Sequence, residues 1–374
     1  MQRVALTTSL GRLMDWCMKQ AATDLHAQAD RRYSFRVDGQ LRRIAPEQFA
    51  IPTNDDILNM LREAFPKSIS DRIEQQHEMD LSLLCGQWRY RANFSKQQGA
   101  QSFSFRVVPQ HIADLDDLQL PAAVAELVRE PRGLLLVSGA SGQGKTTTAC
   151  ALLQRLNETM ALRIITIEDP VEYLFVEEKC QFEQREVGVD TDSFALAIGN
   201  ALRQDPEVIF LGDIRDRETI QTAMQAAETG TLVLGTLHAD SVAQTIDRIR
   251  DLHPALEQAS AGALLARSLN AIICQRLVPG VLHKRIPCLE IMRSNPATQD
   301  AITRNDPHLL AGLIEASANE GMHSFDQHLA QLLKKEAVTL ETARHFAVNW
   351  DKLEMEMHGY ASPKPGILKP GPGE

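Results

Sequence analysis

Short apolar runs alternate with stretches of helical periodicity through the second half of the chain. Residues 133–138, 208–211 and 232–237 are almost wholly apolar, which is typical of strands buried on both faces of a parallel sheet. Apolar residues at helical spacing follow the first of these runs at 147–156 and return at 219–227. Because strands and helices alternate, the pattern predicts an α/β fold in which helices pack on a parallel sheet.

The first 111 residues have a mixed pattern and are predicted to form a separate, small α+β domain. Amphipathic helices are expected at 10–22 and 55–64. Alternation of apolar and polar residues predicts strands at 25–29, 33–37, 41–44, 81–84, 88–94 and 102–108. The last three of these strands would form a β-meander.

Three arginines of this meander alternate with aromatic residues. They are Arg89, Arg91 and Arg106, and we expect them to share one face of the sheet because side chains alternate between the two faces of a strand. Two interpretations stay open. The arginines form an ordinary solvated face, or they meet a nucleotide bound elsewhere, including one held on a neighbouring subunit.

Other stretches show no period. Residues 112–121 are acidic, end at a proline and are predicted to link the first domain to a second one at 122–350. Residues 184–191 carry charges without a period and are predicted to form a loop. Residues 351–374 end in a Pro/Gly-rich run and are predicted to be a disordered tail.

Composition and charge mainly exclude classes of function. Of the 374 residues, 44% are hydrophobic and 24% charged, as in ordinary globular proteins. A net charge of −10 argues against nucleic acid as the main partner. No uncharged apolar run reaches the roughly 18 residues of a membrane-spanning helix, and the N-terminus lacks the features of a signal peptide. The six cysteines never form C-x-x-C pairs, so we expect a cytoplasmic protein without a zinc knuckle.

The first candidate for chemistry follows the strand at 133–138. Residues 139–146 read G-x-x-x-x-G-K-T, the pattern of a phosphate-binding loop. Its glycines allow backbone N–H groups to face phosphate oxygens, and the start of the next helix adds a partial positive charge. Lys145 is expected to reach the β- and γ-phosphates of ATP, and the Thr146 hydroxyl to ligate Mg²⁺. The predicted nucleotide-binding residues are Gly139, Ala140, Ser141, Gly142, Gln143, Gly144, Lys145, Thr146 and Thr147.

Acidic residues follow two other predicted strands. Glu168, Asp169 and Glu172 come after the strand at 163–167, and Asp213 comes after the run at 208–211. In open α/β sheets ligands bind beyond the carboxyl ends of the strands, so these carboxylates are expected near the phosphates. Asp213 has the position of a Walker B acid, which orders Mg²⁺, usually through a water molecule. The alternative for Asp213 is a turn residue or a helix N-cap.

A polar tip also ends the run at 232–237. Thr236 and His238 stand where a sensor of the γ-phosphate would stand, and a histidine can exchange hydrogen-bond partners when the phosphate leaves. The alternative is a histidine that caps the helix expected to begin near Ser241.

Taken together, these motifs resemble those of the secretion ATPases of type II secretion systems and type IV pili. The chain is most similar to the PilT/PilU-type pilus retraction ATPases, over about residues 10 to 350. The stretches that carry the resemblance are 21–26, 36–39, 139–148, 166–173 (the family's Asp box), 184–187, 212–219 and 235–239 (its His box).

The resemblance implies a RecA-like ATPase domain preceded by a PAS-like domain. It implies that Glu172 orients the attacking water, with Asp213 as Walker B acid, His238 as His-box residue and Lys145 at the phosphates. Family arginines match Arg89, Arg91, Arg106, Arg203 and Arg215. The implied assembly is a homo-hexamer peripheral to the inner membrane at the pilus base, where it meets a platform protein and a paralogous PilT-type ATPase.

Two departures from the family pattern qualify this assignment. The family usually has Glu where this chain has Asp213, which is one methylene shorter, so hydrolysis is expected to be slower. The stretch 297–306 keeps only an echo of a run on which PilT-driven retraction depends. Missing C-x-x-C pairs favour retraction over pilus assembly. The alternatives are an ATP-binding accessory subunit with weak hydrolysis, or a related type II or type IVB secretion ATPase.

Overall fold

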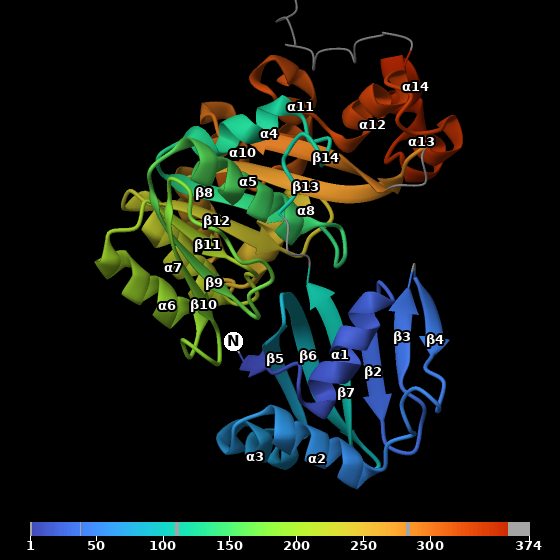
Figure 1. Ribbon diagram of the computed structural model, residues 1–374. Coiled ribbons are helices and arrows are strands. Elements are labelled where there is room, and N and C mark those ends of the chain that lie inside the picture. Colours follow the sequence, from blue (N-terminus) through green and yellow to red (C-terminus); the bar gives the residue numbers. More distant parts are fainter. Residues whose placement is uncertain (1, 38, 109–111, 282–284, 358–374) are drawn as a thin grey trace, which may run out of the picture. The chain divides into compact units, whose positions relative to one another are not determined.

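The computed structural model describes residues 2–37, 39–108, 112–281 and 285–357. The chain divides into two compact units (Figure 1). The first comprises Met1–His111 together with Pro170–Leu174, and the second comprises Ile112–Asp169 and Phe175–Glu374. The short segment Pro170–Leu174 therefore groups with the first unit although the chain on both sides of it belongs to the second.

The first unit is a sheet with the strand order β1-β5-β6-β7-β2-β3-β4. Its neighbouring strands are antiparallel, except that β1 and β5 are parallel. The strands are β1 (Gln2–Val4), β2 (Asp24–Gln28), β3 (Ser34–Val37), β4 (Gln40–Arg43), β5 (Glu78–Cys85), β6 (Trp88–Gln97) and β7 (Ala100–Val108). The helices are α1 (Ser9–Lys19), α2 (Asn54–Ala64) and α3 (Lys67–Gln75). The strands and helices predicted for this domain are present, whereas β1 and α3 were not predicted.

Helices α1 and α2 bury their apolar stripes against one face of this sheet. Leu13 of α1 and Ile57 of α2 are fully buried with the aromatic side chains of β6 and β7. Local sequence fixes where both helices begin, because Thr8 and Thr53 accept hydrogen bonds from the first turns as N-caps. Along β6 the core face carries Tyr90 and Phe94, so the alternate residues point to the other face.

The second unit is a sheet with the strand order β10-β9-β11-β12-β8-β13-β14. All neighbours are parallel except β13 and β14. When the parallel strands β8, β9, β11, β12 and β13 are numbered 1 to 5 along the chain, they lie side by side in the sheet in the order 5-1-4-3-2. This is the RecA-like arrangement. The strands are β8 (Gly133–Ser138), β9 (Arg163–Glu168), β10 (Gln181–Glu186), β11 (Val208–Leu211), β12 (Leu232–Leu237), β13 (Leu269–Pro279) and β14 (Arg285–Arg293). The predicted α/β class with a parallel sheet is confirmed.

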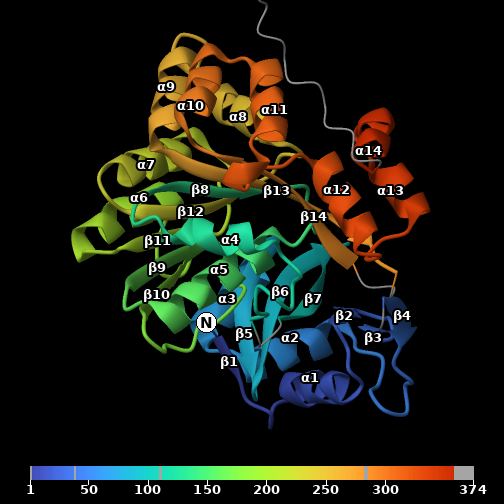
Figure 2. The ribbon, with the colours of Figure 1, turned by 90° about the horizontal axis from the view of Figure 1, so that it is seen from above.

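Helices cover both faces of this sheet. Figure 2 shows α5 on one side and α8 and α9 on the other. The main helices are α4 (Ala122–Glu126), α5 (Lys145–Thr159), α6 (Phe194–Ala201), α7 (Arg217–Glu228), α8 (Val242–Asp251), α9 (Gln258–Ser268), α10 (Pro296–Arg304), α11 (Pro307–Ala316), α12 (Phe325–Lys334), α13 (Leu340–Phe346) and α14 (Trp350–Met357). The central strands read as continuous apolar runs because each of their faces meets helices.

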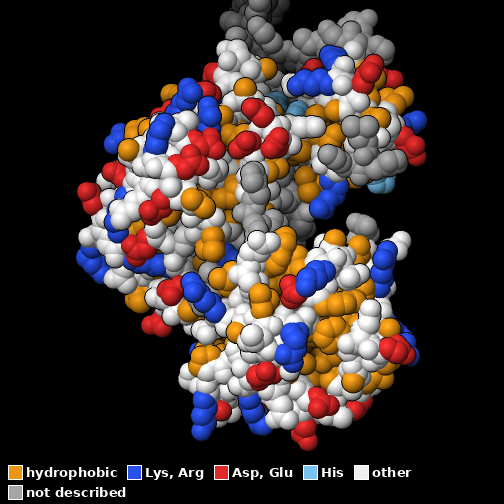
Figure 3. All heavy atoms as spheres, viewed as in Figure 1, with side chains coloured by type: hydrophobic (Ala, Val, Ile, Leu, Met, Phe, Trp, Pro, Cys, Tyr) orange, Lys and Arg blue, Asp and Glu red, His pale blue; other side chains and the backbone are white. Residues whose placement is uncertain are grey.

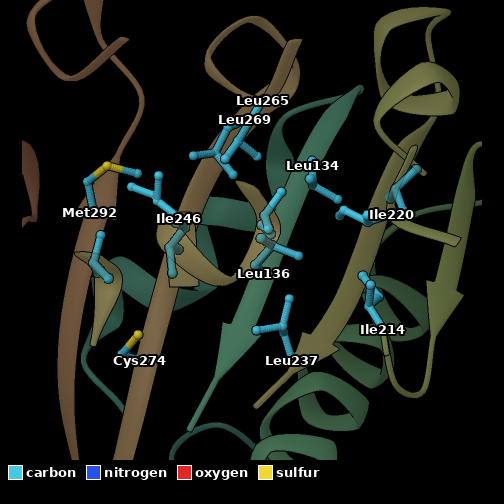
Figure 4. Close-up of a cluster of buried hydrophobic side chains, with 14 of the residues drawn as sticks. Leu134, Leu136, Ile214, Ile220, Leu237, Ile246, Leu265, Leu269, Cys274 and Met292 are labelled. Carbon is cyan, nitrogen blue, oxygen red and sulfur yellow. The ribbon is translucent and has the colours of Figure 1, made fainter. Parts of the chain in front are cut away.

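Alternate residues of β8 serve the two cores. Leu134 and Leu136 point into the cluster drawn in Figure 4, where they meet Ile220 of α7 and Leu265 of α9. The residues between them, such as Leu135, are equally buried on the opposite face. With both faces packed, β8 fixes the point from which the loop at its carboxyl end begins. None of the helices in the described ranges has the length and apolar character needed to cross a membrane.

Two sequence predictions are wrong in part. Residues 184–186 belong to β10, not to a loop. This strand lies at the sheet edge beside β9, and its polar side chains, such as Glu183 paired with Arg163, hide the strand pattern. Residues 351–357 of the predicted tail lie in helix α14, whose Leu353 is fully buried. The Pro/Gly-rich run that motivated the prediction begins only at Gly359, outside the described residues.

Candidate nucleotide site

The predicted phosphate loop has the backbone conformation that its glycines permit. It joins the end of β8 to the start of α5, and Gly142 and Gly144 have φ of 76° and 80°. Residues that carry a side chain rarely adopt this left-handed backbone conformation. Gly144 is the N-cap of α5 and offers no side-chain oxygen. The N–H groups of the first turn are thus left without a side-chain cap, which is the arrangement that binds anions at helix starts.

Lys145 folds back over the loop from the first position of α5. Its residue is only 7% exposed. The ammonium group donates to the carbonyl of Ala140 over 3.0 Å and lies 3.2 Å from Nδ1 of His238. Thr146 follows Lys145 directly and is half-buried. The charge of Lys145 is therefore held at the loop by protein groups.

Asp213 follows β11 and lies beside Arg215 and His238. Its Oδ2 accepts from Nε of Arg215 over 2.6 Å and lies 3.3 Å from Nε2 of His238. Its Oδ1 is buried and has no hydrogen-bond partner within the described ranges. The hydrogen bond to Asp213 also raises the pKa of the Arg215 guanidinium. The helix-cap alternative is wrong, since Asp216 caps α7 by accepting from the Thr219 N–H.

His238 leaves the end of β12 and contacts both charged residues. When Lys145 donates to Nδ1, Nε2 carries the proton and donates to Asp213, which is the neutral tautomer with both nitrogens used. The cap alternative is again wrong, because Ser241 caps α8. Thr236 does not stand as a free phosphate sensor, since its hydroxyl donates to the Gly212 carbonyl over 2.6 Å.

The acidic residues at the end of β9 make different contacts. Glu168 is buried, and its Oε1 accepts from Thr166 over 2.8 Å and from Gln184 over 3.4 Å. Asp169 lies 3.6 Å from Nη1 of Arg215. Arg215 thus links the residues that follow β9 with the acid that follows β11.

The remaining predicted residues belong to other elements of the chain. Arg203 is in the short 3₁₀ turn Leu202–Gln204 and donates to Asn200. Glu172 belongs to the first compact unit, as do the three arginines of the meander. The roles of all of these residues at a nucleotide stay predictions.

The shared face of the three meander arginines is confirmed by the strand register. Arg91 of β6 is directly opposite Arg106 of β7, on the face away from Tyr90. Arg106 is paired with Asp24 through Nε and Oδ1 at 2.8 Å, and this bond helps to lower the pKa of Asp24 against the effect of its burial. Arg89 donates to the carbonyl of Val171.

A cavity of about 660 Å³ opens beside the loop. Its walls include Ala140 and Ser141 of the loop, His238, and the face of α8 that carries Asp247 and Arg248. On the side of the second unit seen in Figure 3, acidic and basic side chains are interspersed and form no basic stripe.

Asn157 is a residue that sequence reasoning missed. It is fully buried near the end of α5. Its Nδ2 donates to the Val176 carbonyl over 2.8 Å, and its Oδ1 accepts from the N–H groups of Glu178 and Cys180 over 3.0 and 3.3 Å. Its own carbonyl accepts from the Lys179 N–H. An asparagine in line with the buried face of a helical pattern was the available signal.

Comparison with known proteins agrees with this geometry. Residues 4–324 match the family described as type II/IV secretion system protein, and the chain belongs to that family. It is 36% identical to the type IV pilus retraction ATPase PilT of Pseudomonas aeruginosa, over 90% of this chain and 97% of that protein. It is 34% identical to the type IV pilus ATPase PilU of the same organism, over 89% of this chain and 87% of that protein.

A solved structure shares the fold. The crystal structure of the pilus retraction motor PilT with bound ADP superposes with a TM-score of 0.83 at 35% identity, covering 92% of this chain and 98% of that one. The resemblance to the type II secretion and type IV pilus ATPases, drawn from the sequence motifs, is thereby confirmed.

Proposed function

We propose that this protein is an ATP-hydrolysing motor that drives the retraction of type IV pili. The observation that carries the proposal is the chain of contacts from Lys145 through His238 to Asp213 at a complete phosphate loop. Its relatives PilT and PilU support the pilus as the filament served.

In this proposal the chain's own residues bind and orient ATP. The N–H groups of the loop and of the start of α5 hold the phosphates, and Lys145 neutralises their charge. Arrival of the γ-phosphate gives Lys145 and His238 a new acceptor, so both exchange partners within the contact chain. Glu172 polarises the attacking water as general base. This role of Glu172, and roles for Arg89, Arg91 and Arg106 at the nucleotide, rest on the family resemblance.

The residues at the loop also fit a magnesium ion. Oδ1 of Asp213 is a buried oxygen without a hydrogen-bond partner in the described part of the chain, and Mg²⁺ prefers carboxylate, hydroxyl and water oxygens. Thr146 and Asp213, the latter through water, would hold the ion. Bound Mg²⁺ would offset the charge that develops on the phosphate oxygens.

The proposed working form is a homo-hexameric ring on the cytoplasmic side of the inner membrane. There it would act on a platform protein at the pilus base, together with a paralogous PilT-type ATPase. Support for this assembly comes from the family resemblance alone.

Pilus dynamics in living cells test the proposal. A strain that lacks the gene is complemented with the wild type, with Lys145→Ala, or with empty vector, and labelled pili are filmed. The wild type should restore retraction, and Lys145→Ala should behave like the vector. Restoration by Lys145→Ala would refute the proposal.

A second candidate is an accessory subunit that binds ATP and turns it over poorly. Asp213 favours it, because the shorter side chain carries its carboxylate about 1.5 Å less far than glutamate would. Steady-state hydrolysis by the wild type and Asp213→Glu separates the two. An inactive wild type that gains turnover on this substitution would establish the accessory subunit and exclude the motor.

A further inference from the structure

A buried glutamine of β13 contacts the phosphate loop. Gln275 is 2% exposed. Its Nε2 donates to the carbonyl of Gln143 over 2.7 Å, and its Oε1 accepts from the Thr148 hydroxyl of α5 over 2.7 Å. The N–H of Leu277, two residues further along β13, donates to Oε1 of Gln143 over 2.6 Å. Strand β13 thus binds both the backbone and the side chain of one loop residue.

The loop and β13 are packed too closely for larger residues. A Cβ atom added to Gly139 would lie 2.5 Å from the carbonyl oxygen of Gln275, and one added to Gly144 would lie 2.9 Å from its Nε2. The glycines therefore serve this close approach as well as the curvature of the loop. The contact that they permit is the one made by Gln275.

This contact fixes one peptide plane of the loop. In a trans peptide the carbonyl and the following N–H point in opposite directions. With the Gln143 carbonyl held by Gln275, the N–H of Gly144 points away from β13. Glycine itself gives little resistance to a flip of this peptide, because both signs of φ are open to it. The restraint therefore comes from Gln275 and not from the loop.

We infer that Gln275 is a positioning residue for phosphate binding, which holds the Gly144 N–H toward the β-phosphate of a bound nucleotide. The inference rests on the proposed nucleotide site. Loss of Gln275 leaves the Gln143 carbonyl and the Thr148 hydroxyl without their buried partner, so the peptide flips and the phosphate loses a donor. AMP has no β-phosphate to accept from the Gly144 N–H, so the effect on ADP should be larger than the effect on AMP.

The test compares ADP with AMP in binding titrations on the full chain. Gln275→Met keeps the length of the side chain and removes both hydrogen bonds. Gln275→Glu keeps an acceptor for Thr148 but replaces the donor to Gln143 by an oxygen and adds a negative charge, so Gln275→Met is the variant that isolates the lost hydrogen bonds. Both variants should bind ADP at least tenfold more weakly than the wild type, while AMP affinity changes less than twofold. Thr298→Val, which removes a buried hydroxyl that accepts from the Asn295 N–H in the cap of α10, should leave the ADP-to-AMP ratio unchanged.

Outcomes for the residue and for the site are distinguishable. The role of Gln275 would be overturned if both Gln275 variants kept the wild-type ratio of ADP to AMP affinity while Lys145→Ala lost the preference for ADP. The proposed site would then still stand. A wild type without preference for ADP over AMP would overturn both. Should the Gln275 variants not fold, Thr148→Val removes the hydroxyl that orients the Gln275 amide and leaves the predicted nucleotide-binding residues unchanged. A wild-type ratio in that variant would also overturn the inference.

Discussion

Nε2 of His238 lies 3.3 Å from Oδ2 of Asp213, so the residues that follow two adjacent parallel strands meet at the carboxyl ends of those strands. The other ring nitrogen of His238 lies 3.2 Å from the ammonium group of Lys145. The imidazole therefore connects the cation of the loop with the acid after β11. A ligand that draws Lys145 away changes the hydrogen bond available to Asp213.

Replacing this connection should affect turnover more than binding. His238→Gln can keep one of the two contacts but not both. We predict a fall of about 10- to 100-fold in kcat with ADP affinity within threefold of the wild type, because a contact that changes during reaction acts on the transition state. His253→Gln is the control, since that histidine belongs to the same unit, is buried and bonds the Ile249 carbonyl through Nδ1. Equal kcat in His238→Gln and the wild type would contradict the connection.

Substitution by glutamine distinguishes Glu172 from Glu168 as the candidate general base. Glu172→Gln should bind ATP normally and release phosphate at least 100-fold more slowly, because the amide cannot accept a proton from water. Glu168→Gln should be milder, since Glu168 is engaged with Thr166 and Gln184. Phosphate release and ATP binding are measured in parallel. Wild-type turnover in Glu172→Gln would move the role of base to Glu168.

Much of this site could be predicted because it is local in sequence. The strand 133–138, the loop and α5 are contiguous, and Asp213 and His238 follow from the common edge of parallel strands. Contacts between distant residues could not be predicted. Gln275 bonds to Thr148 across 127 residues of chain, and no pattern within either segment encodes that pairing. The edge strand β10 was missed because polar residues on an edge strand resemble those of a loop.

Asn157 gives a prediction about the loop that carries Glu172. Asn157→Leu removes the bonds to Val176, Glu178 and Cys180. The N–H of the buried Cys180 loses its partner at a cost of about 1–3 kcal/mol. Hydrogen exchange at 176–180 should accelerate and kcat should fall, while ADP affinity is retained. Thr159→Ala, which removes an exposed hydroxyl bonded within the same helix, is the control. Unchanged exchange and kcat in Asn157→Leu would show that this anchor is dispensable.

Two histidines predict acid sensitivity of the C-terminal helices. Burial lowers the pKa of His323 to about 4 and of His328 to about 3, below the unfolded value of about 6.5. As pH falls below about 6.5 the unfolded chain takes up protons first, so the free energy of unfolding decreases by about 1.4 kcal/mol per pH unit for each histidine. Burial raises the pKa of Asp326, which acts in the opposite direction.

Comparison of two proteins isolates the histidine effect from that of Asp326. His328→Gln keeps an acceptor for the Leu289 N–H but cannot titrate. Urea unfolding at pH 7, 6 and 5 should show a shallower loss of stability in the variant than in the wild type. Parallel stability curves would contradict the assignment of His328.

Steady-state phosphate release from ATP, measured for the wild type and Lys145→Ala at equal protein concentration, tests the central claim most directly. The account predicts magnesium-dependent turnover by the wild type and background turnover by Lys145→Ala, with both proteins folded by circular dichroism. Turnover by Lys145→Ala at the wild-type rate would contradict the assignment of hydrolysis to this loop.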